Sequence, residues 1–255
     1  MAISLFERLN RSLLDTDRLA LFKRLLWGRG SWPVRVNLHL PNSRVESGGE
    51  IKGEVRLAGG STSQMVEQVF LALVLEYNVK EKGVEKTVRR VVVRTKVMDA
   101  ILVAANSPEV VLPVRLKVPS VSPCSSEKTR YRLEAGVEQG GSLVSADACA
   151  MTVEPNAYLR MLFEALTKQG FLEQSHNGSY INHYQRFSYE PTGELARRFA
   201  ELTLFVQSGE QELDVIVDVS KHSDAKGQDR FKLPYARMQS PEQVGMTIQQ
   251  LLAQI

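Results

Sequence analysis

Residues 64–97 limit the folds open to this chain more than any other stretch of the sequence. The first part reads as a strand whose two faces are both apolar, with Val69, Leu71, Leu73, Leu75 and Tyr77 on one side and Phe70, Ala72 and Val74 on the other. Such a strand needs cover on both faces. Residues 80–83 hold charges and a glycine, which suits a short hairpin loop. The pattern predicts a long β-hairpin within a β-sandwich.

The second arm of this hairpin, residues 87–97, is predicted to be buried on one face only. Regular alternation assigns Val91, Val93, Thr95 and Val97 to the core, and Arg90, Arg94 and Lys96 to the opposite face. These three cations form a candidate basic strip that could contact phosphates, although a solvated strand face is the favoured interpretation. No aromatic side chain is interleaved to stack on bases, so nucleic acid is not predicted as a partner.

Regular strand spacing extends this prediction over the first half of the chain. With the hairpin, the alternating segments 34–40, 51–57, 110–118, 131–137 and 143–153 make seven strands in about 120 residues, as expected of a sandwich. A length of 255 residues allows one large domain or two ordinary ones. We therefore predict a helical leader over residues 1–30, a β-sandwich over 31–154 and a second β-rich domain over 155–255.

The second half is predicted to mix helices with strands. Pro155 and Asn156 begin a helix in which Leu159, Leu162, Phe163 and Leu166 share one face, and Gly170 ends it. Residues 172–183 read as a polar loop. Strands are predicted at residues 184–189, 202–206 and 213–219, with a short one near Phe231, before a closing helix that opens at Pro241. The pattern leaves open whether this domain is a complete sandwich or an α+β unit.

The leader is both amphipathic and basic. Residues 1–29 hold six basic and three acidic residues, so they carry the whole formal excess of +3. Two helices are predicted, over residues 2–14 and 17–27. The candidate contact residues for a protein partner or an anionic membrane surface are Arg8, Arg11, Lys23, Arg24 and Trp27. The alternatives are a helix docked on the sandwich, pairing of the two terminal helices (residues 2–27 and 240–254) with each other, and a homodimer through these helices.

Residues that could support catalysis are sparse, so we predict no enzyme, no metal and no cofactor. The one candidate metal site combines His176, His183 and Glu173, and solvated loop histidines are the favoured alternative. Asp214 and Asp218 would lie roughly 13 Å apart at about 3.3 Å per residue, too far for paired acid–base work, and read as a solvated face. With no signal peptide and no apolar span, the sequence predicts a cytoplasmic protein, with membrane association through the leader as the alternative.

Several segments, taken in order, resemble those of a known family. They are residues 34–60, 67–73, 112–119, 131–137, 158–171, 185–191 and 213–219. Together they resemble the bacterial sporulation-control family of arrestin-like proteins, from about Pro33 to Pro234. The resemblance implies a mainly β fold, with an arrestin-like sandwich, a second β-rich domain, and helices at both ends and at the domain junction. It also implies a non-enzymatic adaptor or regulatory scaffold that acts through protein partners.

Overall fold

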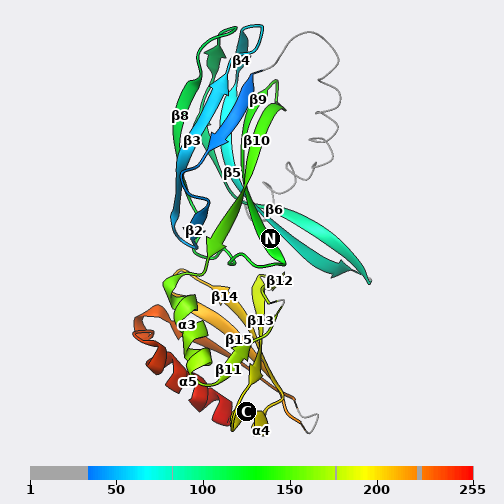
Figure 1. Cartoon of the computed structure of the whole chain (residues 1–255), viewed down its shortest axis with the longest axis vertical. Coiled ribbons are helices and arrows are strands. Elements are labelled where there is room, and N and C mark those ends of the chain that lie inside the picture. Colours follow the sequence, from blue (N-terminus) through cyan, green and yellow to red (C-terminus); the bar gives the residue numbers. More distant parts are fainter. Residues whose placement is uncertain (1–33, 82, 176, 223–225, 255) are drawn as a thin grey trace, which may run out of the picture.

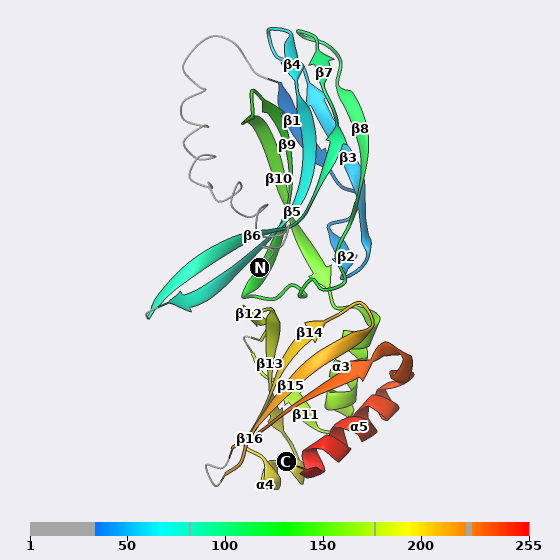
Figure 2. The same cartoon turned by 180° about the vertical axis from the view of Figure 1, so that it is seen from behind.

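The structure, a computed structural model, is mainly β and has two hydrophobic cores along its long axis (Figures 1 and 2). It describes residues 34–81, 83–175, 177–222 and 226–254. The leader and its candidate contact residues Arg8, Arg11, Lys23, Arg24 and Trp27 lie outside the described residues, as does His176.

Two sheets packed around one core make up the first half of the chain. The three-stranded sheet has the order β1 (Arg35–His39), β3 (Glu50–Ala58), β8 (Val110–Lys117). The five-stranded sheet has the order β2 (Arg44–Glu46), β10 (Ser142–Glu154), β9 (Thr129–Gln139), β5 (Gln68–Glu81), β6 (Val84–Met98). A further ribbon pairs β4 (Gln64–Val66) with β7 (Ile101–Val103). The long strands are those expected from alternation, whereas the short strands β2, β4 and β7 were not predicted.

Strand β5 is buried on both faces, as its sequence predicts. Val69, Leu71 and Leu73 are 0% exposed and face the core between the sheets. On the opposite face, Phe70 and Val74 are 8% and 4% exposed. Strand β5 lies between β9 and β6 in the sheet, so its backbone is paired along both edges.

Strand β6 departs from the regular alternation that the sequence suggests. Its register against β5 shifts between Leu73 and Val74, and again between Val69 and Phe70. At the first shift, Val91 pairs with Val74 and Val93 pairs with Leu73, which leaves Val92 as an extra residue. A β-bulge of this kind reverses the side-chain alternation along the strand. Val91 therefore shares the outer face with Val74, and its predicted place in the core is wrong.

The second half is one sheet with helices on one face, so the α+β alternative holds. The main path of its six-stranded sheet is β11 (Phe171–Glu173), β13 (Tyr184–Pro191), β14 (Glu201–Ser208), β15 (Glu212–Ser220) and β16 (Lys226–Pro234), and β12 (Ser179–Ile181) pairs with β13. Helices α3 (Ala157–Lys168) and α5 (Pro241–Gln254) lie together on one face, and α4 (Leu195–Arg198) and η2 (Tyr235–Arg237) are short. Strands β11 and β12 occupy what the sequence presents as a loop.

Helix α3 begins and ends where the sequence predicts. The Asn156 side chain accepts a hydrogen bond from the Leu159 backbone N–H at 2.9 Å, which satisfies a free donor of the first turn. Leu159, Leu162 and Leu166 are buried against the sheet. Gly170 follows the helix with φ +91°, a backbone conformation that glycine adopts readily.

Side chains of β10 cover the edge of β1 and join the two sheets. The Leu38 backbone N–H donates to Asp147 Oδ2 at 2.8 Å, and the Val36 N–H donates to Ser145 Oγ at 3.3 Å. An unpaired strand edge can template association with another chain. These hydrogen bonds satisfy two backbone donors of the β1 edge within the molecule, so these donors are not available to another chain.

Replacing Asp147 by alanine is expected to lower the free energy of unfolding by about 1.5 kcal/mol, because a part-buried N–H loses a charged acceptor. Asp147→Asn keeps an acceptor oxygen and should lose less. Urea denaturation of the two variants tests this order. Equal stability of Asp147→Ala and the unaltered protein would show that water replaces the carboxylate without cost.

Candidate interaction surface

The structure describes only part of the candidate metal site, because His176 lies outside the described residues. No group of three or more His, Cys, Asp or Glu side chains is placed to hold a metal ion in the part of the chain that the structure describes. His183 lies in the tight turn between β12 and β13 with φ +72°. The Glu173 carboxylate accepts a hydrogen bond from the Asn177 amide at 3.3 Å. His183 and Glu173, the two described residues of the candidate metal site, therefore belong to local turn and loop structure.

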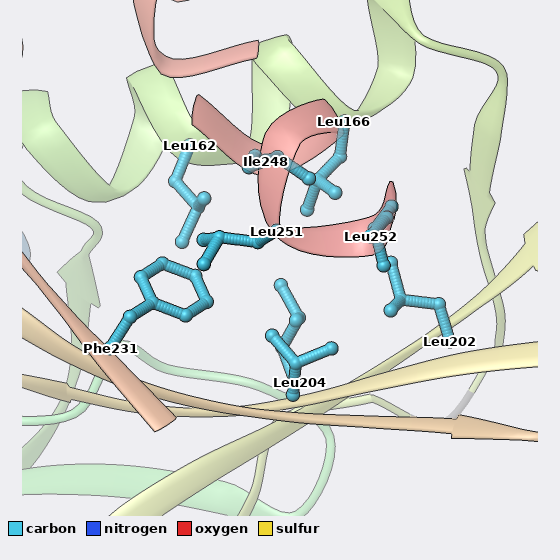
Figure 3. A pocket seen from close by; sticks show the side chains of 9 residues that line it. Leu162, Leu166, Leu202, Leu204, Phe231, Ile248, Leu251 and Leu252 are labelled. Atoms are coloured by element: carbon cyan, nitrogen blue, oxygen red, sulfur yellow. The ribbon is translucent and has the colours of Figure 1, made fainter. Parts of the chain in front are cut away.

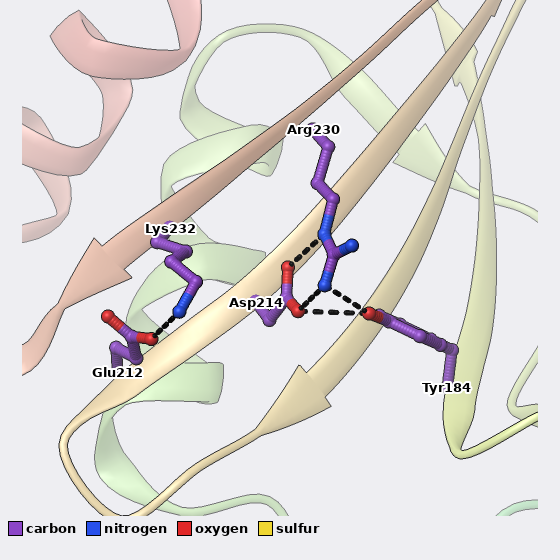
Figure 4. A network of polar contacts seen from close by, with 5 residues as sticks. All are labelled: Tyr184, Glu212, Asp214, Arg230 and Lys232. Atoms are coloured by element: carbon purple, nitrogen blue, oxygen red, sulfur yellow. Dashed lines mark hydrogen bonds and ion pairs between the residues drawn. The ribbon is translucent and has the colours of Figure 1, made fainter.

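Asp214 lies on the sheet face opposite the helices, beside exposed charged side chains, and is held there in a polar network (Figure 4). Its side chain is 15% exposed, and its carboxylate accepts from Arg230 Nε at 3.0 Å and from the Tyr184 hydroxyl at 2.9 Å. The hydrogen bond from Arg230 is the main cause that lowers the pKa of Asp214 below its usual value. Lys232 pairs with Glu212 beside it. This network ties β13, β15 and β16 together on the sheet face opposite α3 and α5.

The candidate basic strip is divided between the two faces of the sheet. Arg90 pairs with Leu75 and shares its core-side face, whereas Arg94 and Lys96 pair with Ala72 and Phe70 on the outer face. The bulge at Val92 causes the division. The prediction that Arg90, Arg94 and Lys96 share one face is therefore wrong, although alternation alone would place them together.

On the outer face of the sheet, the basic residues of β6 form ion pairs with acidic side chains and do not make an unpaired basic strip. Arg94 Nη2 lies 2.7 Å from Glu138, and its guanidinium lies 4.0 Å from the centre of the Phe70 ring. Arg89, which the sequence did not single out, bridges Glu76 and Glu134. Lys96 pairs with Asp99 at 2.7 Å. Because Glu134 and Glu138 lie on β9, about 45 residues from their partners, only the strand register brings these charges together.

At the junction, each half of the molecule contributes one buried residue to the hydrophobic core of the other half. Tyr180 of β12 belongs to the first core and packs edge-on against Tyr77 at a centroid distance of 5.1 Å. Cys124, from the first half, belongs to the second core. Burial raises the pKa of the Cys124 thiol to about 12, so the group stays neutral at physiological pH.

Gln185 is a buried polar link across this junction. Its side chain is buried and makes four contacts: it accepts from the Cys124 N–H at 3.0 Å and from Cys124 Sγ at 3.1 Å, and donates to the carbonyls of Cys124 at 2.7 Å and Gly178 at 3.1 Å. Gly178 O also accepts from Thr129 at 2.6 Å. Buried amides paired this completely favour one arrangement of the backbone around them.

A space lined by apolar side chains lies between the helices and the sheet of the second half (Figure 3). It encloses about 250 Å³ including its open mouth, and nine apolar side chains line it, among them Leu162, Leu204, Phe231 and Ile248. No polar group converges on it. The space is a gap in the packing of the hydrophobic core, and its lining lacks the polar groups that orient a small ligand.

The β5–β6 hairpin extends beyond the sheet to form an arm, which we define as residues 78–87. The pairing of β5 with β9 ends at Tyr77 and Thr129, and the remainder is a two-stranded ribbon that projects at the level of the junction (Figures 1 and 2). Asn78 bonds Thr87 at 2.9 Å and Glu85 at 3.1 Å across the ribbon. Val84 is 68% exposed. Within the described chain, β6 has a sheet neighbour on one side only.

The family described as SpoOM protein matches residues 22–223. A curated relative, sporulation-control protein spo0M of Bacillus subtilis (strain 168), is 19% identical over 256 residues that span 92% of this chain and 99% of the relative. The crystal structure of Spo0M from Bacillus subtilis matches with a TM-score of 0.76 and 19% identity, over 88% of this chain and 99% of that one. At this level of identity, the structural match shows a shared fold.

Proposed function

We propose that this chain, which belongs to the SpoOM protein family, is a non-enzymatic regulatory adaptor that binds an extended segment of a protein partner along β6. The observation that carries the proposal is the outer edge of β6, a strand of 15 residues that continues into the projecting arm and has no described strand paired along that edge. An exposed edge offers a row of backbone donors and acceptors to an added strand. The arrestin-like resemblance of the sequence points to the same use of exposed edges.

The charge of β6 disfavours a second copy of this chain as the added strand. The strand holds five basic residues and one acidic residue. Antiparallel pairing of two β6 strands would bring basic side chains close to one another, which destabilises a sheet. Because Arg89, Arg94 and Lys96 already pair with acidic side chains of this chain, the added strand is recognised mainly through its backbone.

A regulatory role without catalysis is supported by two further observations. The curated relative bears the name of a sporulation-control protein. In this chain, Asp214, one of the two aspartates considered for acid–base chemistry, is held by Arg230 and Tyr184. Two free cysteines fit a reducing compartment, so we place the protein in the cytoplasm. None of the described helices is long and apolar enough to cross a membrane.

Shortening the arm tests the proposal. Replacing residues 78–87 by Asn-Gly would connect Tyr77 to Val88, which are already cross-strand neighbours, through a two-residue turn. Because no third strand among the described residues pairs with the arm, the shortened protein is expected to keep its fold and thermal stability. Partners captured by the unaltered chain from its host should bind the shortened chain at least about tenfold more weakly, a loss of about 1.4 kcal/mol.

Hydrogen exchange of the complex distinguishes edge binding from other contacts. Backbone amides of β6 should become protected when the partner binds, while those of β11 should not change. A partner that binds the shortened chain with undiminished affinity, and leaves the exchange of β6 unchanged, would place the docking site elsewhere and refute the edge-binding proposal.

A further inference from the structure

The outer face of the three-stranded sheet carries an excess of positive charge. Strands β1, β3 and β8 together hold five basic and two acidic residues, and all seven alternate with core-facing positions, so they lie on the face turned away from the core. Residues 30–255 as a whole hold 26 basic and 26 acidic residues, because six of the 32 basic and three of the 29 acidic residues come before residue 30. The excess on this face is therefore local.

Three of these basic residues, Lys52, Arg115 and Lys117, lie where β3 begins and β8 ends, and we call them the basic patch. One carboxylate lies among them: Lys52 Nζ and Arg115 Nη1 are each 3.5 Å from the same oxygen, Glu50 Oε2. The Lys52 and Arg115 side chains are 60% and 72% exposed. With three basic residues and one acidic residue, this end of the face keeps two positive charges in excess.

The strand register makes the basic patch unfavourable for the sheet itself. Lys52 and Arg115 are direct cross-strand partners. Like charges placed opposite one another destabilise a sheet. Glu50 relieves this only in part, because both of its contacts are longer than the 2.7–2.9 Å of a strong charge-assisted hydrogen bond. A local arrangement that works against stability is expected at functional sites.

The acidic residues around the sheet do not neutralise the basic patch. Glu46, which precedes the turn into β3, pairs across the junction with Arg160 at 2.9 Å. Toward the other end of the face, Arg56 pairs with Glu54 at 2.8 Å, and Glu109 also acts on Arg56. Among the described residues, the positive charge of the patch therefore remains available to a ligand.

We propose that the basic patch binds an acidic segment of a protein partner, whose Asp or Glu side chains pair with Lys52, Arg115 and Lys117. Charge complementarity of this kind selects partners and speeds their association. The contact is made by the side chains of the sheet face, since Pro113 removes a backbone donor from the edge strand β8 and disfavours strand addition there.

Other anionic partners fit the basic patch less well. Recognition of anionic lipid uses clusters of about 4–8 Lys or Arg residues, more than the patch holds. Binding to single-stranded nucleic acid uses aromatic side chains that stack on bases, and β1, β3 and β8 contain no Phe, Tyr or Trp. Three cations on a flat face suit a short run of carboxylates.

The basic patch is separate from the β6 edge, which belongs to the five-stranded sheet. Figures 1 and 2 show β3 and β8 on the side of the first half away from the arm. An adaptor with both surfaces would hold two partners at once. The inference does not depend on edge binding, because each surface can be altered without changing the other.

Fluorescence anisotropy with a labelled peptide tests the proposal on the full chain. The probe is Glu-Ser-Glu-Ser-Glu-Ser-Glu, and the same peptide with Gln in place of Glu serves for comparison. The triple variant Lys52→Gln/Arg115→Gln/Lys117→Gln is expected to bind the acidic peptide at least about tenfold more weakly than the unaltered protein. The matched control Lys128→Gln/Arg197→Gln/Arg237→Gln removes the same charge at exposed positions elsewhere and should bind normally.

Charge reversal gives a second readout. The variant Lys52→Glu/Arg115→Glu/Lys117→Glu should lose the acidic peptide and gain affinity for Lys-Ser-Lys-Ser-Lys-Ser-Lys. The proposal is overturned if the acidic peptide binds the unaltered protein no more tightly than the Gln peptide, or if the Gln variant of the patch binds as tightly as the control. It is also overturned if duplex DNA or phosphatidylglycerol vesicles bind through the patch more tightly than the peptide, since the partner would then belong to another class.

Discussion

Replacement of Gln185 by leucine is expected to lower the free energy of unfolding by about 4 kcal/mol. Leucine is similar in size but lacks polar atoms, so the backbone N–H and carbonyl of Cys124 would lose their side-chain partner inside the protein. Each buried group left unsatisfied costs about 1–3 kcal/mol. For a chain of this length, the midpoint of thermal unfolding should fall by about 10 °C.

Gln250→Leu is the matched control for this substitution. Gln250 is exposed on α5, and the same chemical change there should alter stability by less than about 0.5 kcal/mol. Chemical denaturation of both variants gives the comparison. The Gln185 variant is also expected to unfold in two separated steps, because this amide links the two halves. A loss below about 1 kcal/mol in a single transition would mean that the junction does not depend on Gln185.

Replacement of Leu73 by alanine is expected to cost a similar amount, about 4 kcal/mol, for a different reason. Leu73 is 0% exposed on β5, which lies between β9 and β6 in the five-stranded sheet. Truncating such a side chain removes its burial and leaves a cavity that neighbouring strands cannot close. The change should be seen as a lower midpoint of urea denaturation.

Leu172→Ala provides the control for Leu73→Ala. Leu172 lies on β11 and is 54% exposed, so the same truncation removes little buried surface and should cost less than about 0.5 kcal/mol. If Leu73→Ala were as mild as this control, the sheet would have to repack around the lost side chain. That result would contradict the central place we assign to β5.

The sequence predicted most of the long elements and little of the interaction surface. The resemblance to sporulation-control proteins is confirmed by the family match over residues 22–223. Strand and helix signals are local, since they depend on side-chain alternation and on caps such as Asn156. The arm exists because β9 ends before β5 and β6 do, and the Arg94–Glu138 pair forms because β6 and β9 flank β5. Neither arrangement can be read from one segment of the sequence.

The sequence by itself determined the faces of β5, the extent of α3 and the mainly β class, because backbone geometry sets the period of each element. Only the tertiary structure decided that Arg90 and Arg94 lie on opposite faces, since the bulge at Val92 exists only in the register of β6 against β5. The same holds for Gln185, whose partner Cys124 is 61 residues away. A glutamine at the start of an alternating strand gives no sign of burial. Its role arises from the packing of the two halves against each other.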